Sequence, residues 1–170
     1  MSIETQNNVC EESVFSTIFK TNSKTVFNYI YYKFGNEEKA HDAVQEAFVK
    51  LWENCAKVPP EKAKSFVYTV ANNLYLNVIK AEKVRLKYAD KSLKNTNETP
   101  EFLMEEDEFR VKLQNALDSL PENQRITFLL NRIDGKKYKE IAEMESVSVK
   151  AIEKRMHLAL KSLREQIDGI

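Results

Sequence analysis

The sequence predicts an all-α protein of two small helical domains joined by an acidic linker. Three observations support this fold class. Apolar residues recur at three- and four-residue spacing along most of the 170 residues, which is the period of an amphipathic helix. Glycine and proline are scarce, with three and four copies, so few helix breaks are expected. No strand-like alternation of useful length occurs, and the helical pattern is lost over residues 90–100.

Residues 10–90 are expected to form a bundle of three or four helices. An apolar stripe begins near residue 14, is interrupted over residues 21–23, and stops at Gly35-Asn36, a typical helix end. The prolines at 59 and 60 separate the two segments that follow it. The expected helical segments are 14–19, 26–34, 40–52 and 61–87.

Residues 109–168 are expected to form a second helical domain, which begins with amphipathic stretches at 109–120 and 121–133. The segment KYKEIAEMESVSVKAIEKRMHLALK, residues 137–161, then predicts a short helix, a tight turn and a longer basic helix. Ser148 suits the N-cap of the longer helix, and Ala142 is small enough to let the two helices meet. This is a helix-turn-helix pattern, whose second helix lies in the DNA major groove. The alternative is an ordinary helical hairpin with a solvated charged face.

Charge is unevenly distributed, although the formal net charge of the chain is zero. Residues 56–91 carry eight bases and three acids, a net charge of +5. Residues 96–108 carry six acids and no base, and residues 131–164 carry nine bases and five acids, a net charge of +4. Two basic blocks therefore flank an acidic one, so that a polyanion can be held at two places.

The remaining composition argues for the cytoplasm and against a membrane. Cys10 and Cys55 form no metal-ligand spacing and no disulfide framework, and two isolated cysteines fit a reducing compartment. No basic start followed by an apolar run marks a signal peptide, and no apolar stretch is long enough to span a bilayer. A cytoplasmic protein without membrane insertion is expected.

The order of these segments resembles the small two-domain sigma factors of bacterial RNA polymerase, the extracytoplasmic-function (ECF) group. DAVQEAFVKLW and SFVYTVANNLYLNVIK resemble region two, and LPENQRITFLLNRIDGKKYKEIAEMESVSVKAIEKRMHLALKSLRE resembles region four. The resemblance covers about residues 10–165. It implies a factor without cofactor or catalysis that binds core RNA polymerase and directs promoter-specific transcription initiation.

The resemblance also assigns roles along the chain. Residues 10–90 would bind the polymerase and read the minus-ten promoter element, residues 91–108 would be the acidic linker, and residues 109–168 would read the minus-thirty-five element. The implied partners are the clamp helices of the largest polymerase subunit, promoter DNA and an anti-sigma factor. When bound to polymerase, such a factor would associate with the nucleoid.

Polymerase binding falls on one helix by this resemblance. Its polar members lie at three- and four-residue steps, so they share a face beside the apolar stripe. The two aromatic members have an equally good interpretation as core. The residues are Asp42, Gln45, Glu46, Phe48, Val49 and Trp52.

The helix over residues 65–80 matches the part that such factors use at the minus-ten element. Aromatic rings can stack on an extruded nucleobase, and side-chain amides can pair with the edges of nucleobases. Lysine and arginine side chains can hold phosphates. The alternative is a helix with a polar outer face and tyrosines at its rim. The residues are Tyr68, Asn72, Asn73, Tyr75, Asn77, Lys80, Lys83 and Arg85.

The helix-turn-helix supplies the expected contacts to the minus-thirty-five element. Arg155 can equally face a phosphate, and Glu153 can accept a hydrogen bond from cytosine or pair with a lysine on its own helix. Two residues depart from the usual motif: Ser146 stands where glycine is common, and Glu145 where an apolar residue is common. The DNA-binding residues are Lys137, Ser148, Lys150, Glu153, Lys154, Arg155, His157 and Lys161.

Two other functions compete with a sigma factor. A stand-alone helix-turn-helix regulator would use residues 1–90 for ligand sensing or dimerisation. An enzyme is suggested only by His41-Asp42, a dipeptide of metal phosphohydrolases. Such a site needs further ligands, and the second histidine, His157, falls in the other domain. We therefore expect no enzyme and no metal site.

Overall fold

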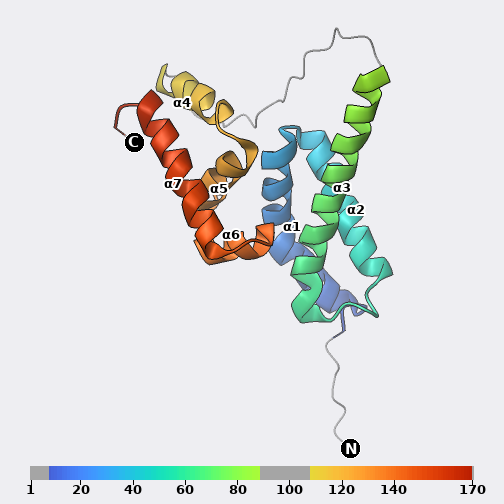
Figure 1. The fold of residues 1–170 in the computed structure, drawn as a ribbon. Helices are drawn as coiled ribbons and strands as arrows, with labels where there is room; N and C mark the ends of the chain where they lie inside the picture. The colour runs from blue at the N-terminus through green and yellow to red at the C-terminus, as the bar shows by residue number, and fades with distance from the viewer. Residues whose placement is uncertain (1–7, 89–107, 170) are drawn as a thin grey trace, which may run out of the picture. The chain divides into compact units, whose positions relative to one another are not determined.

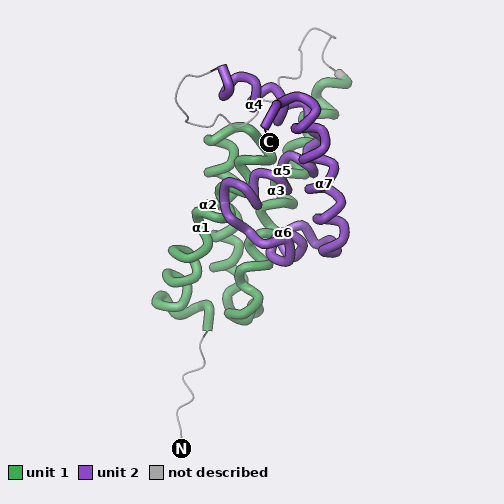
Figure 2. Tube along the Cα trace, turned by 90° about the vertical axis from the view of Figure 1, so that its left-hand side faces the viewer, with its two compact units in different colours: residues 1–98 green, residues 99–170 purple. Residues whose placement is uncertain are grey.

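The computed structural model describes residues 8–88 and 108–169, which form seven helices and no strand (Figure 1). The chain divides into two compact units, Met1–Glu98 and Thr99–Ile170, which Figure 2 colours separately. The predicted all-α class is confirmed. The predicted linker over residues 91–108 lies, apart from Glu108, outside the described residues. Within those described ranges, every helix is too short or too polar to cross a membrane.

Unit 1 is a bundle of three helices, α1 (Glu12–Phe34), α2 (Glu37–Glu53) and α3 (Pro60–Tyr88), each of which packs on the other two. The apolar stripes predicted from the sequence meet in one core. This burial removes large aliphatic side chains from water and is the main source of the unit's stability. Fully buried side chains include Val26, Ile30, Ala47, Leu51, Val67 and Ala71.

Helix α1 is continuous, so the interruption predicted over residues 21–23 is wrong. Its polar side chains bond to the helix's own carbonyls instead of breaking it. The Asn22 Nδ2 donates to the Ile18 carbonyl at 2.9 Å, and the Thr25 Oγ1 donates to the Asn22 carbonyl at 3.0 Å. The helix ends as predicted at Gly35, whose φ of 65° is left-handed.

The start of helix α2 is fixed by interactions in its first turn. The Asn36 Oδ1 accepts a hydrogen bond from the Lys39 backbone N–H at 2.9 Å, which caps the helix. Glu37 and Glu38 follow it, where negative charge is favourable to the helix dipole. The buried stripe then alternates with exposed polar residues on the opposite side of the helix. Its members are Ala40, Ala43, Val44, Ala47, Phe48 and Leu51.

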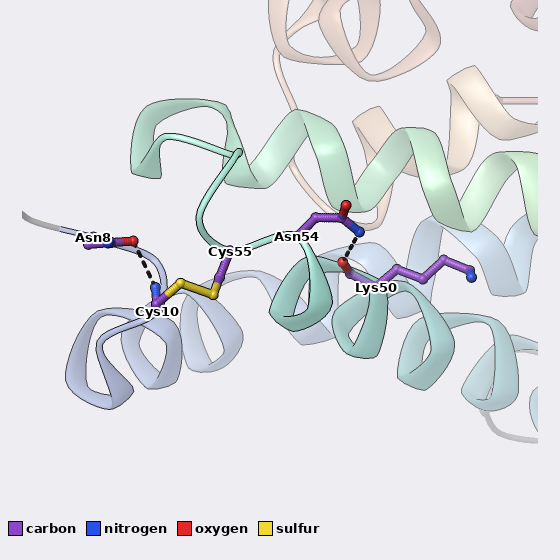
Figure 3. The surroundings of a disulfide bond; sticks show 5 residues. All are labelled: Asn8, Cys10, Lys50, Asn54 and Cys55. Atoms are coloured by element: carbon purple, nitrogen blue, oxygen red, sulfur yellow. Dashed lines mark hydrogen bonds between the residues drawn. A yellow bond between two sulfur atoms is a disulfide. The ribbon is translucent and has the colours of Figure 1, made fainter.

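The two cysteines form a disulfide, so the prediction that they are isolated is wrong (Figure 3). Cys10 lies just before α1, and Cys55 lies in the loop after α2. Their Cα atoms are 5.0 Å apart across a sequence separation of 45 residues. Spacing along the chain could not reveal this pairing, because it depends on the packing of α1 against α2, which brings the two segments together.

Unit 2 contains α4 (Glu108–Asp118), α5 (Glu122–Arg132), α6 (Tyr138–Glu145) and α7 (Val149–Gln166). Helix α7 packs on the other three. Thr127 is the buried polar residue of the described core, and its hydroxyl is satisfied by donating to the Asn123 carbonyl at 2.8 Å. Buried apolar side chains include Leu117, Leu120, Ile126, Leu129, Leu130, Ile141, Ile152, Met156 and Leu163.

Candidate nucleic-acid interface

Helices α6 and α7 form the predicted helix-turn-helix. The Ser148 Oγ accepts a hydrogen bond from the Ala151 backbone N–H at 3.2 Å, so Ser148 is the N-cap of α7, as predicted. At the start of α6, the Glu140 carboxylate accepts from the Lys137 backbone N–H at 2.7 Å. Ala142, the small residue of α6, is buried. Both helix starts are therefore fixed by local hydrogen bonds.

The turn between these helices places Ser146 at φ 54°, ψ 43°, in the left-handed region. Among the described residues it alone has a positive φ without being glycine. A positive φ is expected here because glycine is usual at this position, and this conformation is strained for serine. The Ser146 backbone N–H donates to the Glu143 carbonyl at 3.3 Å, and that of Val147 donates to the Ala142 carbonyl at 3.0 Å. These bonds close the turn.

Glu145, the second residue that departs from the usual motif, forms an ion pair. Glu145, which stands where an apolar residue is common, accepts from the Arg155 Nη1 at 3.3 Å. The two side chains are only 11% and 21% exposed. The ion pair therefore joins the end of α6 to the second turn of α7. In this arrangement the Arg155 guanidinium joins the two helices of the motif.

The outer face of α7 is otherwise as predicted. Lysines recur on it at positions 150, 154 and 161, together with Glu153 and His157, and all are exposed. Two apolar side chains on this face, Val149 and Leu158, were not predicted, although hydrophobic residues outside the apolar stripe were a signal for them. The exposed residues of the face are Ser148, Val149, Lys150, Glu153, Lys154, His157, Leu158, Lys161 and Arg164.

The predicted minus-ten residues of α3 separate into buried and exposed groups. Tyr68 and Tyr75 are only 4% and 5% exposed, so their assignment as base-stacking rings is wrong. The Tyr68 ring packs on Tyr29, with centroids 5.4 Å apart, and the Tyr75 ring packs on Phe34 at 4.8 Å. They face the bundle because an aromatic ring at helical spacing gains more from core packing than from water.

Asn72 is also drawn into the bundle. The Lys33 Nζ of α1 donates to the Asn72 Oδ1 at 2.7 Å and lies 4.6 Å from the Tyr29 ring centroid. The ammonium group therefore bridges an amide and an aromatic face. The other predicted α3 residues lie on the outer surface. Asn73, Asn77, Lys80, Lys83 and Arg85 are exposed.

The predicted polymerase-binding face of α2 is mostly solvent-exposed, and Phe48 is the exception. Its ring is buried against Phe19, with centroids 4.8 Å apart, and against Phe15 at 6.4 Å. Trp52 remains 47% exposed and contacts the Phe15 ring edge-on at 5.1 Å. Phe19 of α1 is exposed beside them and was not predicted. The exposed members on α2 are Asp42, Gln45, Glu46, Val49 and Trp52.

A groove of about 500 Å³ lies between α2 and α3, next to this face. Asp42 and Glu46 line one side of it, and Leu74, Asn77 and Val78 line the other. His41 points elsewhere: it stacks on Phe27 with ring centroids 4.3 Å apart. Residues 8–88 and 108–169 contain no group of three metal-ligating side chains around it or elsewhere. Two carboxylates beside apolar side chains suit contact with a helix of a partner protein.

Two family models match the chain, one in each unit. The model for sigma-70 region 2 matches residues 18–85, and the model for sigma-70 region 4 matches residues 110–163. The first match includes most of α1, all of α2 and all but the last turn of α3, and the second runs from α4 into α7.

Individual proteins give the same result. The chain is 30% identical over 141 residues to the ECF RNA polymerase sigma-E factor of Escherichia coli K12, covering 75% of this chain and 71% of that protein. It is 23% identical over 154 residues to the ECF RNA polymerase sigma factor SigE of Mycolicibacterium smegmatis. That match covers 88% of this chain but only 60% of the mycobacterial protein.

The fold is shared with a solved structure of a sigma factor. The sigma factor RpoE of Bartonella quintana, crystallised in complex with the anti-sigma factor NepR, superimposes with a TM-score of 0.68. The match covers 89% of this chain and 95% of that chain at 17% sequence identity. At this level of identity the likeness concerns the fold alone.

Proposed function

Because the chain belongs to the ECF sigma factors of RNA polymerase, which direct the enzyme to promoters, we propose that its two units divide promoter recognition between them. The observation that carries this proposal is the position of the two family matches, one inside each unit. The functional division is that expected from the sequence: residues 10–90 for the polymerase and the minus-ten element, residues 91–108 as linker, and residues 109–168 for the minus-thirty-five element.

In unit 2, α7 is the recognition helix. Lys150, Lys154 and Lys161 form a row of exposed positive charge that suits base edges and phosphates of the major groove. Val149 adds an apolar side chain at the start of the helix, where it suits a thymine methyl group. Lys137, exposed at the start of α6, suits a backbone phosphate. Arg155 is assigned instead to holding the turn.

In unit 1, the outer face of α3 handles the minus-ten element. No aromatic side chain within residues 60–87 is exposed, so an extruded base would be held by amides and not by stacking. Asn73 and Asn77 lie one turn apart and offer paired donors and acceptors. Lys80, Lys83 and Arg85 continue toward the end of the helix and suit the phosphates of the same strand.

The exposed α2 face binds the clamp helices of the largest polymerase subunit. It combines carboxylates and an amide with the apolar surface of Val49 and Trp52, and Phe19 extends this surface onto α1. An interface with an aromatic centre and a polar rim is typical of specific protein association. Since RNA polymerase and the chromosome are cytoplasmic, the chain is expected to work there.

An anti-sigma factor is a further expected partner. The Bartonella sigma factor with the same fold was crystallised with one. The exposed polymerase and DNA faces of this chain are surfaces that such an inhibitor would cover. A stand-alone regulator is not favoured, because the region 2 match occupies the part of the chain that would have to serve as a sensing or dimerising bundle.

Reconstituted transcription tests the proposal. Purified chain, core RNA polymerase and a genomic promoter library should yield transcripts with defined start sites, whereas core enzyme alone should not. The chain alone should shift promoter DNA poorly in a gel assay. If core enzyme gains no promoter preference, or if the chain binds operator DNA tightly by itself, the proposal is wrong.

A further inference from the structure

We propose that Cys10 and Cys55 form a reversible, redox-sensitive disulfide that orders the polymerase-binding end of unit 1. This inference depends on the function proposed above. The sequence contains two cysteines, and the structure brings them together (Figure 3). Both are half-buried, so small thiols and disulfides can reach them. In a reducing compartment, a disulfide is typically transient and often senses redox state.

The disulfide anchors the start of α1, which has few other stabilising contacts. Glu11, the N-cap of α1, makes no side-chain capping bond. The preceding residues form a short turn, in which the Asn8 Oδ1 accepts from the Cys10 backbone N–H at 3.0 Å. Val9 is fully buried within it. Without the disulfide, the first turn of α1 would depend on these few contacts and is expected to fray.

At the other end of the disulfide, the backbone around Cys55 is held by hydrogen bonds. The Asn54 Nδ2 donates to the Lys50 carbonyl at 2.8 Å and closes the end of α2, as Figure 3 shows. The backbone N–H of Lys57 donates to the Asn54 carbonyl at 2.9 Å, which makes a turn around Cys55. Cys55 is therefore a fixed point to which the start of α1 is joined.

This junction lies beside the proposed polymerase face. Trp52 is three residues before Cys55, and its ring contacts Phe15, five residues after Cys10, at 5.1 Å. Phe15 also contacts the buried Phe48. Fraying of the first turns of α1 would remove the ring that supports the exposed Trp52. The redox state of the two cysteines is thereby coupled to the order of the surface that binds polymerase.

The chemistry balances with a small disulfide as the oxidant. One protein thiolate attacks the disulfide and forms a mixed disulfide, releasing one small thiol. The second protein thiolate then displaces the other small thiol and forms the Cys10–Cys55 bond. Two electrons pass from the protein to the oxidant, and the two thiol protons are carried by the two small thiols that leave. Dithiol reductants reverse the sequence.

We expect the oxidised chain to bind core RNA polymerase about threefold to tenfold more tightly than the reduced chain, since a pre-ordered side chain loses less entropy on binding. The chain should be prepared in both states, with oxidised glutathione and with dithiothreitol, and the loss of two hydrogens checked by mass spectrometry. Affinity for core enzyme is then measured for each state. Trp52, the single tryptophan, reports locally through its fluorescence.

Two variants serve as controls. Cys55→Ser keeps one thiol, which glutathione can cap in the oxidising buffer, and the double variant Cys10→Ser/Cys55→Ser keeps none. Both should bind core enzyme like the reduced chain in both buffers, and the Trp52 emission of the double variant should not respond to either reagent. Three results would overturn the inference: thiols that stay free in oxidised glutathione, an unchanged Trp52 emission, or equal affinity of the two redox states. Equal affinity leaves the sigma-factor function intact. If neither state binds core enzyme, the proposed function fails as well.

Discussion

Ser146 has the one non-glycine positive φ among the described residues, and the hydrogen bonds that close its turn join backbone atoms. The left-handed conformation disfavours an L side chain by roughly 1–2 kcal/mol, whereas glycine adopts it freely. Part of this gain is offset because glycine is more flexible in the unfolded chain. We expect Ser146→Gly to raise the free energy of unfolding of unit 2 by about 0.5–1 kcal/mol.

Thermal denaturation followed by circular dichroism measures this change. Ser148→Ala, two residues away, is the matched control, because Ser148 caps α7 through its hydroxyl. Its loss should lower stability by about 1 kcal/mol. If Ser146→Gly is neutral or destabilising, the strain assigned to the turn is absent.

The Glu145–Arg155 ion pair permits a second prediction at the residue scale. Both side chains are mostly buried, so removal of one takes a charge-assisted hydrogen bond from the other at a site where little water can replace it. We expect Arg155→Met and Glu145→Gln each to reduce stability by about 1–2 kcal/mol, an amount between exposed and fully buried pairs. A double-mutant cycle, read by urea denaturation, should show that the two losses are not additive. Strict additivity would mean that the pair contributes nothing.

Single residues also mark what the sequence could predict. The exposed lysines of α7 followed from helical periodicity, because charged groups remain in water whatever the helix packs against. Tyr68 and Tyr75 did not, because a tyrosine at the edge of an apolar stripe suits core and surface alike, and only packing against α1 decides. The role of Arg155 depends on Glu145, ten residues away and across a turn.

At the scale of helices, α7 predicts a specific salt dependence. Each lysine that neutralises one phosphate releases about one counterion, so its removal should lower the slope of log affinity against log salt by about 0.9. We expect Lys154→Ala to show this loss for holoenzyme binding to promoter duplex. Lys112→Ala, exposed on α4 and outside the recognition face, is the charge-matched control and should leave the slope unchanged. Equal slopes for both variants would remove Lys154 from the interface.

Helix α3 predicts a separate effect on strand opening. If the Asn77 amide holds an extruded base, Asn77→Ala should slow the formation of open complexes about tenfold, which corresponds to one or two lost hydrogen bonds. The initial binding to duplex should not change. Permanganate footprinting of unpaired thymines over time measures opening. Ser65→Ala, about three turns earlier on the same helix, is the control and should open DNA at the normal rate.

Most helix boundaries could be predicted from the sequence, but the predicted break within helix α1 was wrong. Helix α1 ends at Gly35 as expected, because the left-handed preference of glycine is local, whereas Asn36, expected only as part of that helix end, also caps α2. The polar run at 21–23 predicted a break that does not occur, since Asn22 and Thr25 bond to the helix backbone. Such side-chain bonds depend on rotamers that helical periodicity does not report.

For the whole molecule, charge distribution matters more than its sum. A chain of zero net charge has little long-range attraction for DNA, so we expect its two basic blocks to act at a promoter only when they are brought there together. Core polymerase is the partner expected to do this. The same reasoning explains why the free chain should bind DNA poorly although α7 carries a lysine row.

The disulfide makes a final prediction for the whole chain. Each unit buries its own core, so each is expected to unfold in its own transition. Both cysteines belong to unit 1, and their bond closes a sequence separation of 45 residues, a constraint worth about 4 kcal/mol. Reduction should therefore lower the melting temperature of unit 1 by about 15 °C or more.

Differential scanning calorimetry of the oxidised and reduced full-length chain measures this shift. The transition of unit 2 should stay where it is, and Ser146→Gly identifies it, because that substitution should move this transition alone. A reductant that lowers both transitions together would show that the two units unfold as one. A reductant that moves neither would show that the Cys10–Cys55 bond does not constrain unit 1.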